Sequence, residues 1–144
     1  MVRSLARRAV GLVLVAVLGS TGCAGFAGDR AEKIDEVAHL FADYLRFNHV
    51  DRAAALVATE RRPEFIALFK APEERALRFT SIDVTGLDVA PDAKTAMVRM
   101  DVRLYRLPSV SEVAFTDVQE WHYDGEAKAW RVEPNLALYE RAGR

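Results

Sequence analysis

The sequence predicts an α+β domain in which helices come first and an antiparallel sheet follows. From Ile34 to Leu45, apolar residues recur at steps of three and four, the period of an amphipathic helix. From Ala96 to Leu104, every second residue is apolar, the period of a half-buried strand. Turn-forming pairs separate the apolar segments of the second half: Pro91-Asp92, Pro108-Ser109 and Asp124-Gly125. We therefore expect three N-terminal helices packed on a four-stranded sheet.

Charged and polar residues set the expected ends of the three helices. The first is expected from Ala31 to about Phe47, where a polar run breaks the pattern. The second is expected from Arg52 to Ala58, with Asp51 as its N-cap. The third has Pro63 in its first turn and stops at Ala71-Pro72, because proline suits the start of a helix and cannot continue one.

After Arg75 the period changes to that of strands. The first strand runs from Phe79 to Val89, and its apolar phase slips around Gly86, which a β-bulge would explain. The second is expected from Thr95 to Leu107 and the third from Glu112 to Tyr123. A fourth, short strand carries Trp130 and Val132. Short turns between all four predict an antiparallel meander.

The N-terminus has the pattern of an export signal. Arg3, Arg7 and Arg8 precede residues 9–19, an 11-residue run without a polar side chain. A helix that crosses the ~30 Å hydrocarbon layer needs roughly 20 residues, so this run is too short to remain as a membrane span. The sequence therefore predicts a cleaved segment.

Small residues, Ser20-Thr21-Gly22, lead into Cys23, the only cysteine of the chain. This order resembles the lipobox of bacterial lipoproteins, with Ser20 where that pattern usually has Leu. The resemblance implies a signal peptide at residues 1–22, a lipidated tether at residues 23–30 and a single domain at residues 31–144. Several acyl chains on one residue would anchor the protein stably, since each buried CH₂ contributes about 0.8 kcal/mol. By resemblance to Gram-negative lipoproteins, Ala24 as the second residue implies sorting to the outer membrane, facing the periplasm.

Composition excludes several classes of function. Removing residues 1–22 takes away three arginines and no acid, so the formal charge of the mature chain is −1 − 3 = −4. A mildly acidic domain is a poor binder of nucleic acid, because binding depends on clustered Lys and Arg. With Cys23 carrying lipid, no thiol remains for a disulfide, a nucleophile or a zinc site. No glycine-rich phosphate loop is present, and we expect no cofactor.

The order of the elements resembles the NTF2-like, or cone-shaped α+β, superfamily. The resemblance covers about residues 31–133 and includes the closing pattern Trp121-His122-Tyr123-Asp124-Gly125 followed by Trp130-Arg131-Val132. It implies a strongly curved sheet wrapped around the first helix, with a cavity between them. A cystatin-like fold, another helix with a curved sheet, is the alternative.

The resemblance also implies candidate catalytic residues. Some members of that superfamily catalyse isomerisations or dehydrations with a buried carboxylate and a hydroxyl, imidazole or acidic partner, as in ketosteroid isomerase. The candidates here are Asp43, Tyr44, Tyr105, Asp117 and His122. No family motif selects these positions. The simpler interpretation, which we favour, places Asp43 and Asp117 among solvated surface charges, Tyr44 in helix packing and His122 on the outer side of a strand.

Glu36, His39 and Asp43 follow one helical stripe and could share a metal ion. The stripe is polar, and no further His or Cys at ligand spacing supports it. We therefore expect a solvated charged face and no metal site.

Aromatic residues of the third strand offer a binding surface. Phe115, Trp121 and Tyr123 share strand parity, so they lie on one face and could form a wall for an apolar ligand. The simpler interpretation, which we favour for these residues and for Trp130, is that they belong to the core beneath the helices.

These observations favour a non-enzymatic binding or assembly module of the cell envelope, held at the membrane through Cys23. Its expected partner is an envelope protein or a small apolar ligand, with a homodimer as a further alternative. A small cavity enzyme with a buried carboxylate is the alternative function.

Overall fold

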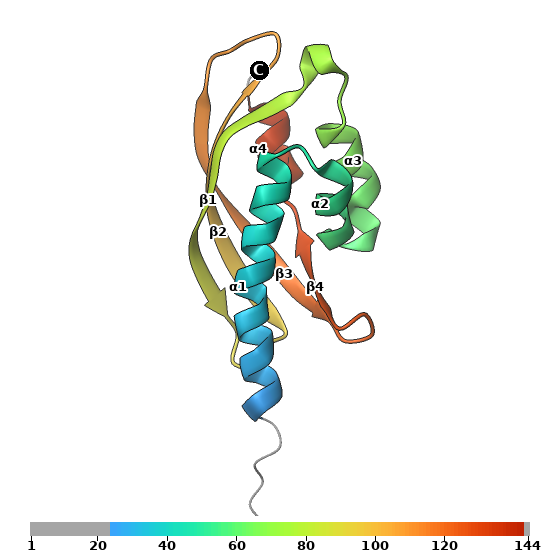
Figure 1. Ribbon diagram of the computed structural model, residues 1–144, viewed down its shortest axis with the longest axis vertical. Helices are drawn as coiled ribbons and strands as arrows, with labels where there is room; N and C mark the ends of the chain where they lie inside the picture. Colours follow the sequence, from blue (N-terminus) through green and yellow to red (C-terminus); the bar gives the residue numbers. More distant parts are fainter. Residues whose placement is uncertain (1–23, 143–144) are drawn as a thin grey trace, which may run out of the picture.

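The computed structural model describes residues 24–142. The expected signal peptide and Cys23 lie outside the described residues. The chain folds as α+β: three α-helices precede a four-stranded antiparallel sheet, and a short helix follows it (Figure 1). The expected fold class and the order of helices before sheet are confirmed.

The first helix, α1, runs from Ala24 to Arg46. It begins well before Ala31, so residues 24–30, which the sequence assigned to a tether, belong to the helix. A residue distant in the sequence stabilises the first turns of α1: the indole Nε1 of Trp130 donates a hydrogen bond of 3.0 Å to the carbonyl oxygen of Arg30. The buried face of α1 carries the apolar stripe that the periodicity predicts, Ile34, Ala38, Phe41, Ala42 and Leu45.

Two short helices follow, α2 (Val50–Leu56) and α3 (Arg62–Phe69), with 3₁₀ turns at Thr59–Arg61 and Glu73–Arg75. Pro63 stands in the first turn of α3, as predicted. The prediction that Asp51 caps the second helix is wrong. His49 holds the N-cap position without a side-chain cap bond, and the Asp51 carboxylate pairs instead with the Lys70 ammonium, 2.7 Å away.

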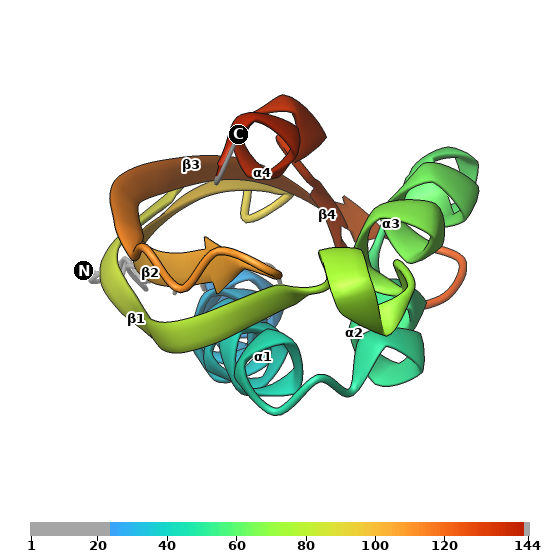
Figure 2. The same cartoon turned by 90° about the horizontal axis from the view of Figure 1, so that it is seen from above.

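The sheet consists of β1 (Leu77–Val89), β2 (Thr95–Arg106), β3 (Val113–Asp124) and β4 (Ala129–Glu133), in the order β1-β2-β3-β4. All three pairings are antiparallel. The β1–β2 register shifts between Phe79 and Ser81 and again between Val84 and Gly86, so the predicted bulge at Gly86 is present and a second lies earlier in the strand. Figure 2 shows the sheet curving around α1, with α2 and α3 at its open side.

The core lies between α1 and the concave face of the sheet. The alternating residues of β2 that the period-two pattern selects, Ala96 to Leu104, are all buried. Trp121 is fully buried and meets the Phe41 ring edge-on at 5.6 Å between centroids. Burial of large aromatic side chains supplies much of the apolar area that stabilises a domain of this size.

A fourth helix, α4 (Leu136–Arg141), was not expected from the sequence. Six residues are too few for a helix that is stable by itself, so tertiary contacts must hold it. The Arg106 guanidinium, at the end of β2, donates hydrogen bonds to the carbonyl oxygens of Tyr139 (2.8 Å) and Ala142 (3.1 Å). A cation at these carbonyls also suits the negative end of the helix dipole.

Within residues 24–142, no helix combines the length and the apolar character needed to span a bilayer.

Candidate functional site

The candidate site lies on the inner face of β3. Odd-numbered residues of this strand point toward the helices, which places Asp117 and Gln119 between Phe115 and Trp121 on one apolar face. Asp117 has 0 % of its surface exposed, and Gln119 has 1 %. A fully buried carboxylate is rare unless it has partners, so its surroundings identify what it does.

Three side-chain hydrogen bonds link the carboxylate to α4 and along β3. The Tyr139 hydroxyl donates to Asp117 Oδ2 (2.7 Å), and the Gln119 amide nitrogen donates to the same oxygen (2.8 Å). The Trp121 indole then donates to Gln119 Oε1 (3.2 Å). The other carboxylate oxygen, Asp117 Oδ1, is buried and has no hydrogen-bond partner among the described residues.

The electrostatics follow from this arrangement. Desolvation raises the pKa of Asp117, and the hydrogen bonds from Tyr139 and Gln119 offset only part of that effect. Burial and the neighbouring Asp117 charge raise the pKa of Tyr139 well above its usual value, so its hydroxyl stays protonated as a donor. No Lys or Arg within the described chain forms an ion pair with Asp117.

Protein side chains fill the space around the pair. The Tyr139 ring contacts the rings of Phe69 and Phe115 edge-on, at 5.2 and 5.3 Å between centroids, and Phe79 lies at 6.3 Å. Among the hollows on the surface of residues 24–142, the linings of four, of about 410–540 Å³ each, include neither Asp117 nor Tyr139. The carboxylate and the hydroxyl donor are therefore each other's partners in the closed structure.

The structure does not bring the other catalytic candidates to this carboxylate. Asp43 is exposed on α1, and Tyr44 is half-buried with its ring 6.3 Å from that of His49. Tyr105 is half-buried near the end of β2. The favoured interpretation is confirmed for Asp43 and Tyr44, but it is wrong for Asp117, because the strand parity that it shares with Trp121 carries it into the core.

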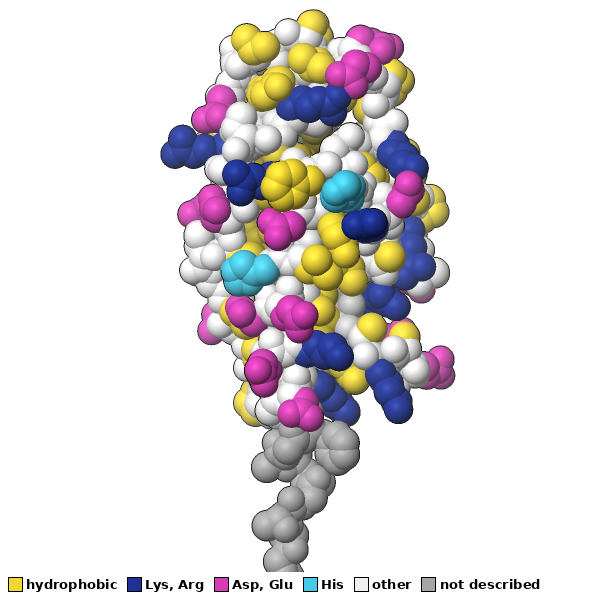
Figure 3. All heavy atoms as spheres, viewed as in Figure 1, with side chains coloured by type: hydrophobic (Ala, Val, Ile, Leu, Met, Phe, Trp, Pro, Cys, Tyr) yellow, Lys and Arg dark blue, Asp and Glu magenta, His cyan; other side chains and the backbone are white. Residues whose placement is uncertain are grey.

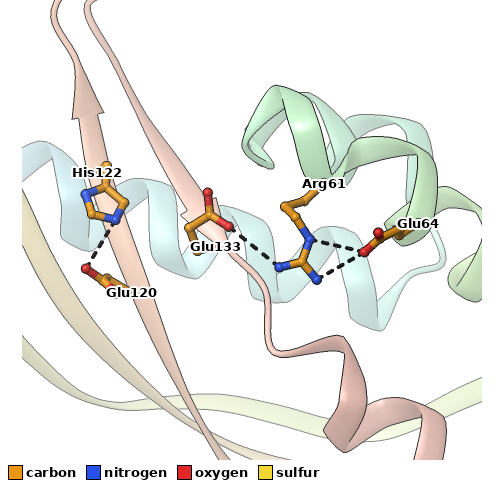
Figure 4. A network of polar contacts seen from close by, with 5 residues as sticks. All are labelled: Arg61, Glu64, Glu120, His122 and Glu133. Carbon is orange, nitrogen blue, oxygen red and sulfur yellow. Dashed lines mark hydrogen bonds and ion pairs between the residues drawn. The ribbon is translucent and has the colours of Figure 1, made fainter.

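His122 lies on the outer side of β3, as expected, with its Nε2 3.2 Å from Glu120 (Figure 4). Nearby, the Arg61 guanidinium lies 3.1 Å from Glu64 on α3 and 3.9 Å from Glu133 on β4. These exposed pairs connect α3 to the sheet edge. Each such surface pair contributes about 0–1 kcal/mol, so they account for the charges without a chemical role.

The stripe of Glu36, His39 and Asp43 faces solvent along α1. The His39 ring nitrogen Nδ1 lies 2.9 Å from the carbonyl oxygen of Asp35, one turn earlier. Among the described residues, no group of three His, Cys, Asp or Glu side chains could hold a metal ion.

The aromatic residues of β3 belong to the core, which is the interpretation favoured above. Trp121 is fully buried, Trp130 is 1 % exposed, and Phe115 and Tyr123 are half-buried against the cluster. Phe115 and Tyr123 border two different hollows, so the three β3 residues do not form one common wall.

Comparison with known proteins gives distant structural likenesses. No protein-family model matches the chain, and no curated protein matches its sequence. The chain is similar in structure to a SEC-C motif containing protein from Rhodopseudomonas palustris, solved in solution, with a TM-score of 0.46 and 14% sequence identity. The likeness covers 63% of this chain and 67% of that protein.

Proposed function

We propose that this chain is a lipid-anchored protein of the bacterial cell envelope, whose NTF2-like domain binds or assembles with another envelope component and does not catalyse a reaction. The element order and the sheet that curves around α1 support the NTF2-like assignment (Figure 2). The basic and apolar N-terminus followed by Cys23 supports the anchor, and Ala24 supports placement in the outer membrane.

The proposal that the domain does not catalyse a reaction is supported by the hydrogen-bonded pair of Asp117 and Tyr139, which is enclosed by other side chains. A general base must reach a proton of its substrate, at about 2.6–3.2 Å or through one water. Here the hydroxyl of Tyr139 and the amide of Gln119 both occupy Oδ2, while aromatic rings fill the adjacent space. The interior of the cone thus serves the stability of the domain, and recognition falls to its surface.

Complementation in the native envelope tests this proposal. We expect Asp117→Asn to keep the cellular function of the lipoprotein, because the amide retains the size and the acceptor oxygen of the carboxylate while removing its basicity. Asp43→Asn, on the exposed face of α1, is the matched control. Crosslinking in intact cells, with Cys23→Ser as the mislocalised control, then identifies the species held by the anchored protein.

One observation favours the alternative, a small cavity enzyme. Asp117 combines a raised pKa, a free buried oxygen and a hydroxyl donor, a set of features that is frequent at active sites. This function would require α4 to move away and admit a substrate. If Asp117→Asn folds normally, localises correctly and still reproduces the null phenotype, the enzyme replaces the binding module as the better proposal.

A further inference from the structure

A hollow of about 410 Å³ lies between the start of α1 and the turn that joins β3 to β4. Its lining consists of Asp29, Arg30, Lys33, Tyr123, Gly125 and Lys128. Arg30 and Lys33 are three residues apart, so they share one side of the helix, and Lys128 faces them from the turn. Figure 3 shows basic side chains at this lower end of the molecule, beside acidic ones.

The cations of this hollow lack carboxylate partners. Lys33 and Lys128 form no ion pair within the described part of the chain, whereas Lys70 is paired with Asp51. The guanidinium of Arg30 lies over the ring of Tyr123, 4.4 Å from its centroid. Three cations and one carboxylate give the lining a formal charge of 3 − 1 = +2.

The acidic residues of the turn, Asp124 and Glu126, are not part of the lining. Asp124 is engaged in the turn itself, since its Oδ1 accepts hydrogen bonds from the backbone N–H groups of Glu126 and Ala127, at 2.9 and 3.0 Å. These bonds lower the pKa of Asp124. Three cations against one carboxylate, Asp29, leave this hollow with the net positive charge that would suit a phosphate group.

The place of the hollow along α1 determines what it can reach. Because α1 is helical from Ala24, Arg30 lies about 9 Å and Lys33 about 14 Å from that residue along the helix axis. A lipid on Cys23, the preceding residue, would bring this end of the helix to the headgroup layer. The cations of the hollow and the charges of the headgroups would then lie at a separation close to the Debye length of about 8 Å, at which screening by salt is incomplete.

We infer that this hollow binds the phosphate of phospholipid headgroups in the bilayer that carries Cys23, and so fixes the orientation of the domain on the membrane. The inference rests on the proposed lipid anchor. Arg30, Lys33 and Lys128 supply the charge, and the Tyr123 ring, with its apolar body, suits the membrane interface.

The test uses the lipidated full-length protein in vesicles of phosphatidylcholine, with or without phosphatidylglycerol, and in neutral detergent micelles. Amide hydrogen exchange of residues 29–33 and 123–128 reports docking. We expect greater protection in vesicles with phosphatidylglycerol, and a loss of that protection in the variant Lys33→Gln/Lys128→Gln. The docked-to-undocked ratio should fall about 25-fold, since each of the two lysines near an anionic surface contributes about a fivefold factor.

Two variants and one probe make the result specific. Lys33→Arg/Lys128→Arg should keep the protection, and Arg75→Gln/Arg99→Gln, an equal loss of charge far from the hollow, should leave it unchanged. Equal protection in the Lys33→Gln/Lys128→Gln variant would overturn the inference. So would the same protection produced in micelles by inorganic phosphate alone, which would indicate a site for the free anion.

The anchor is tested separately by labelled fatty acid on Cys23. Protein that carries label and floats with vesicles, but shows no protection, contradicts the inference and leaves the anchor intact. Protein without label contradicts the anchor itself.

Discussion

Replacing Tyr139 by phenylalanine isolates the bond that joins α4 to the sheet. The substitution removes the hydroxyl that donates to Asp117 Oδ2 at 2.7 Å and keeps the ring that contacts Phe69 and Phe115. A hydrogen bond to a charged acceptor contributes about 1.5–3 kcal/mol, so at a pH where Asp117 is ionised, Tyr139→Phe should lower the free energy of unfolding by that amount. For a domain of this size the Tm should fall by roughly 6–12 °C.

Urea denaturation and calorimetry of the purified protein measure this loss. Tyr123→Phe is the matched control, because the Tyr123 hydroxyl has no hydrogen-bond partner among the described residues, and it should change stability by less than about 0.5 kcal/mol. In the Asp117→Asn variant the acceptor of this hydrogen bond is uncharged. Adding Tyr139→Phe to that variant should therefore lower the free energy of unfolding by only about 0.5–1.5 kcal/mol. A loss in Tyr139→Phe no larger than in the control would refute the claim that this bond holds α4.

Three further outcomes are expected. Trp121→Ala should destabilise the domain by about 3–5 kcal/mol in urea, since the ring is fully buried against Phe41, and a near-neutral result would contradict its place in the core. Burial raises the pKa of Asp117 in the folded state, so the contribution of this carboxyl group to stability is present below the unfolded pKa and is lost as pH rises through the folded pKa. The stability of Asp117→Asn relative to the unsubstituted protein should therefore rise as pH increases from the unfolded pKa through the folded pKa, and a difference that does not change with pH would show that the carboxyl group titrates alike in both states. Cys23→Ser should remain an unlipidated precursor, and labelled fatty acid on that variant would disprove the assigned attachment site.

Local periodicity was sufficient to predict most of the fold. The alternation in β2 follows from one buried and one polar face, and Gly86 marked a real change of register in β1. Short helices and helix ends were harder to predict, because they depend on tertiary contacts. The start of α1 depends in part on the Trp130 indole, and α4 depends on the Arg106 guanidinium, and neither contact leaves a local pattern.

The buried carboxylate was missed although a signal for it existed. Asp117 and Gln119 share the parity of Phe115, Trp121 and Tyr123, so a strand with that face inward must bury them too. The usual exposure of aspartate outweighed this argument. The hydrogen-bond partner of Asp117 could not be predicted, because Tyr139 lies 22 residues away on a helix that was not expected from the sequence.

The two free edges of the sheet differ in how they resist pairing with another chain. Beside β4, Val57 forms a parallel bridge to Val132, and the N–H of Ala58 donates to the Val132 carbonyl at 2.9 Å, so part of that edge is already occupied. At the opposite edge, the two shifts of register interrupt β1 and increase its local twist. A bent strand is a poor template for edge-to-edge growth. Copies of the protein crowded on one membrane surface would thus present no straight, unpaired strand to which a strand of another copy could add.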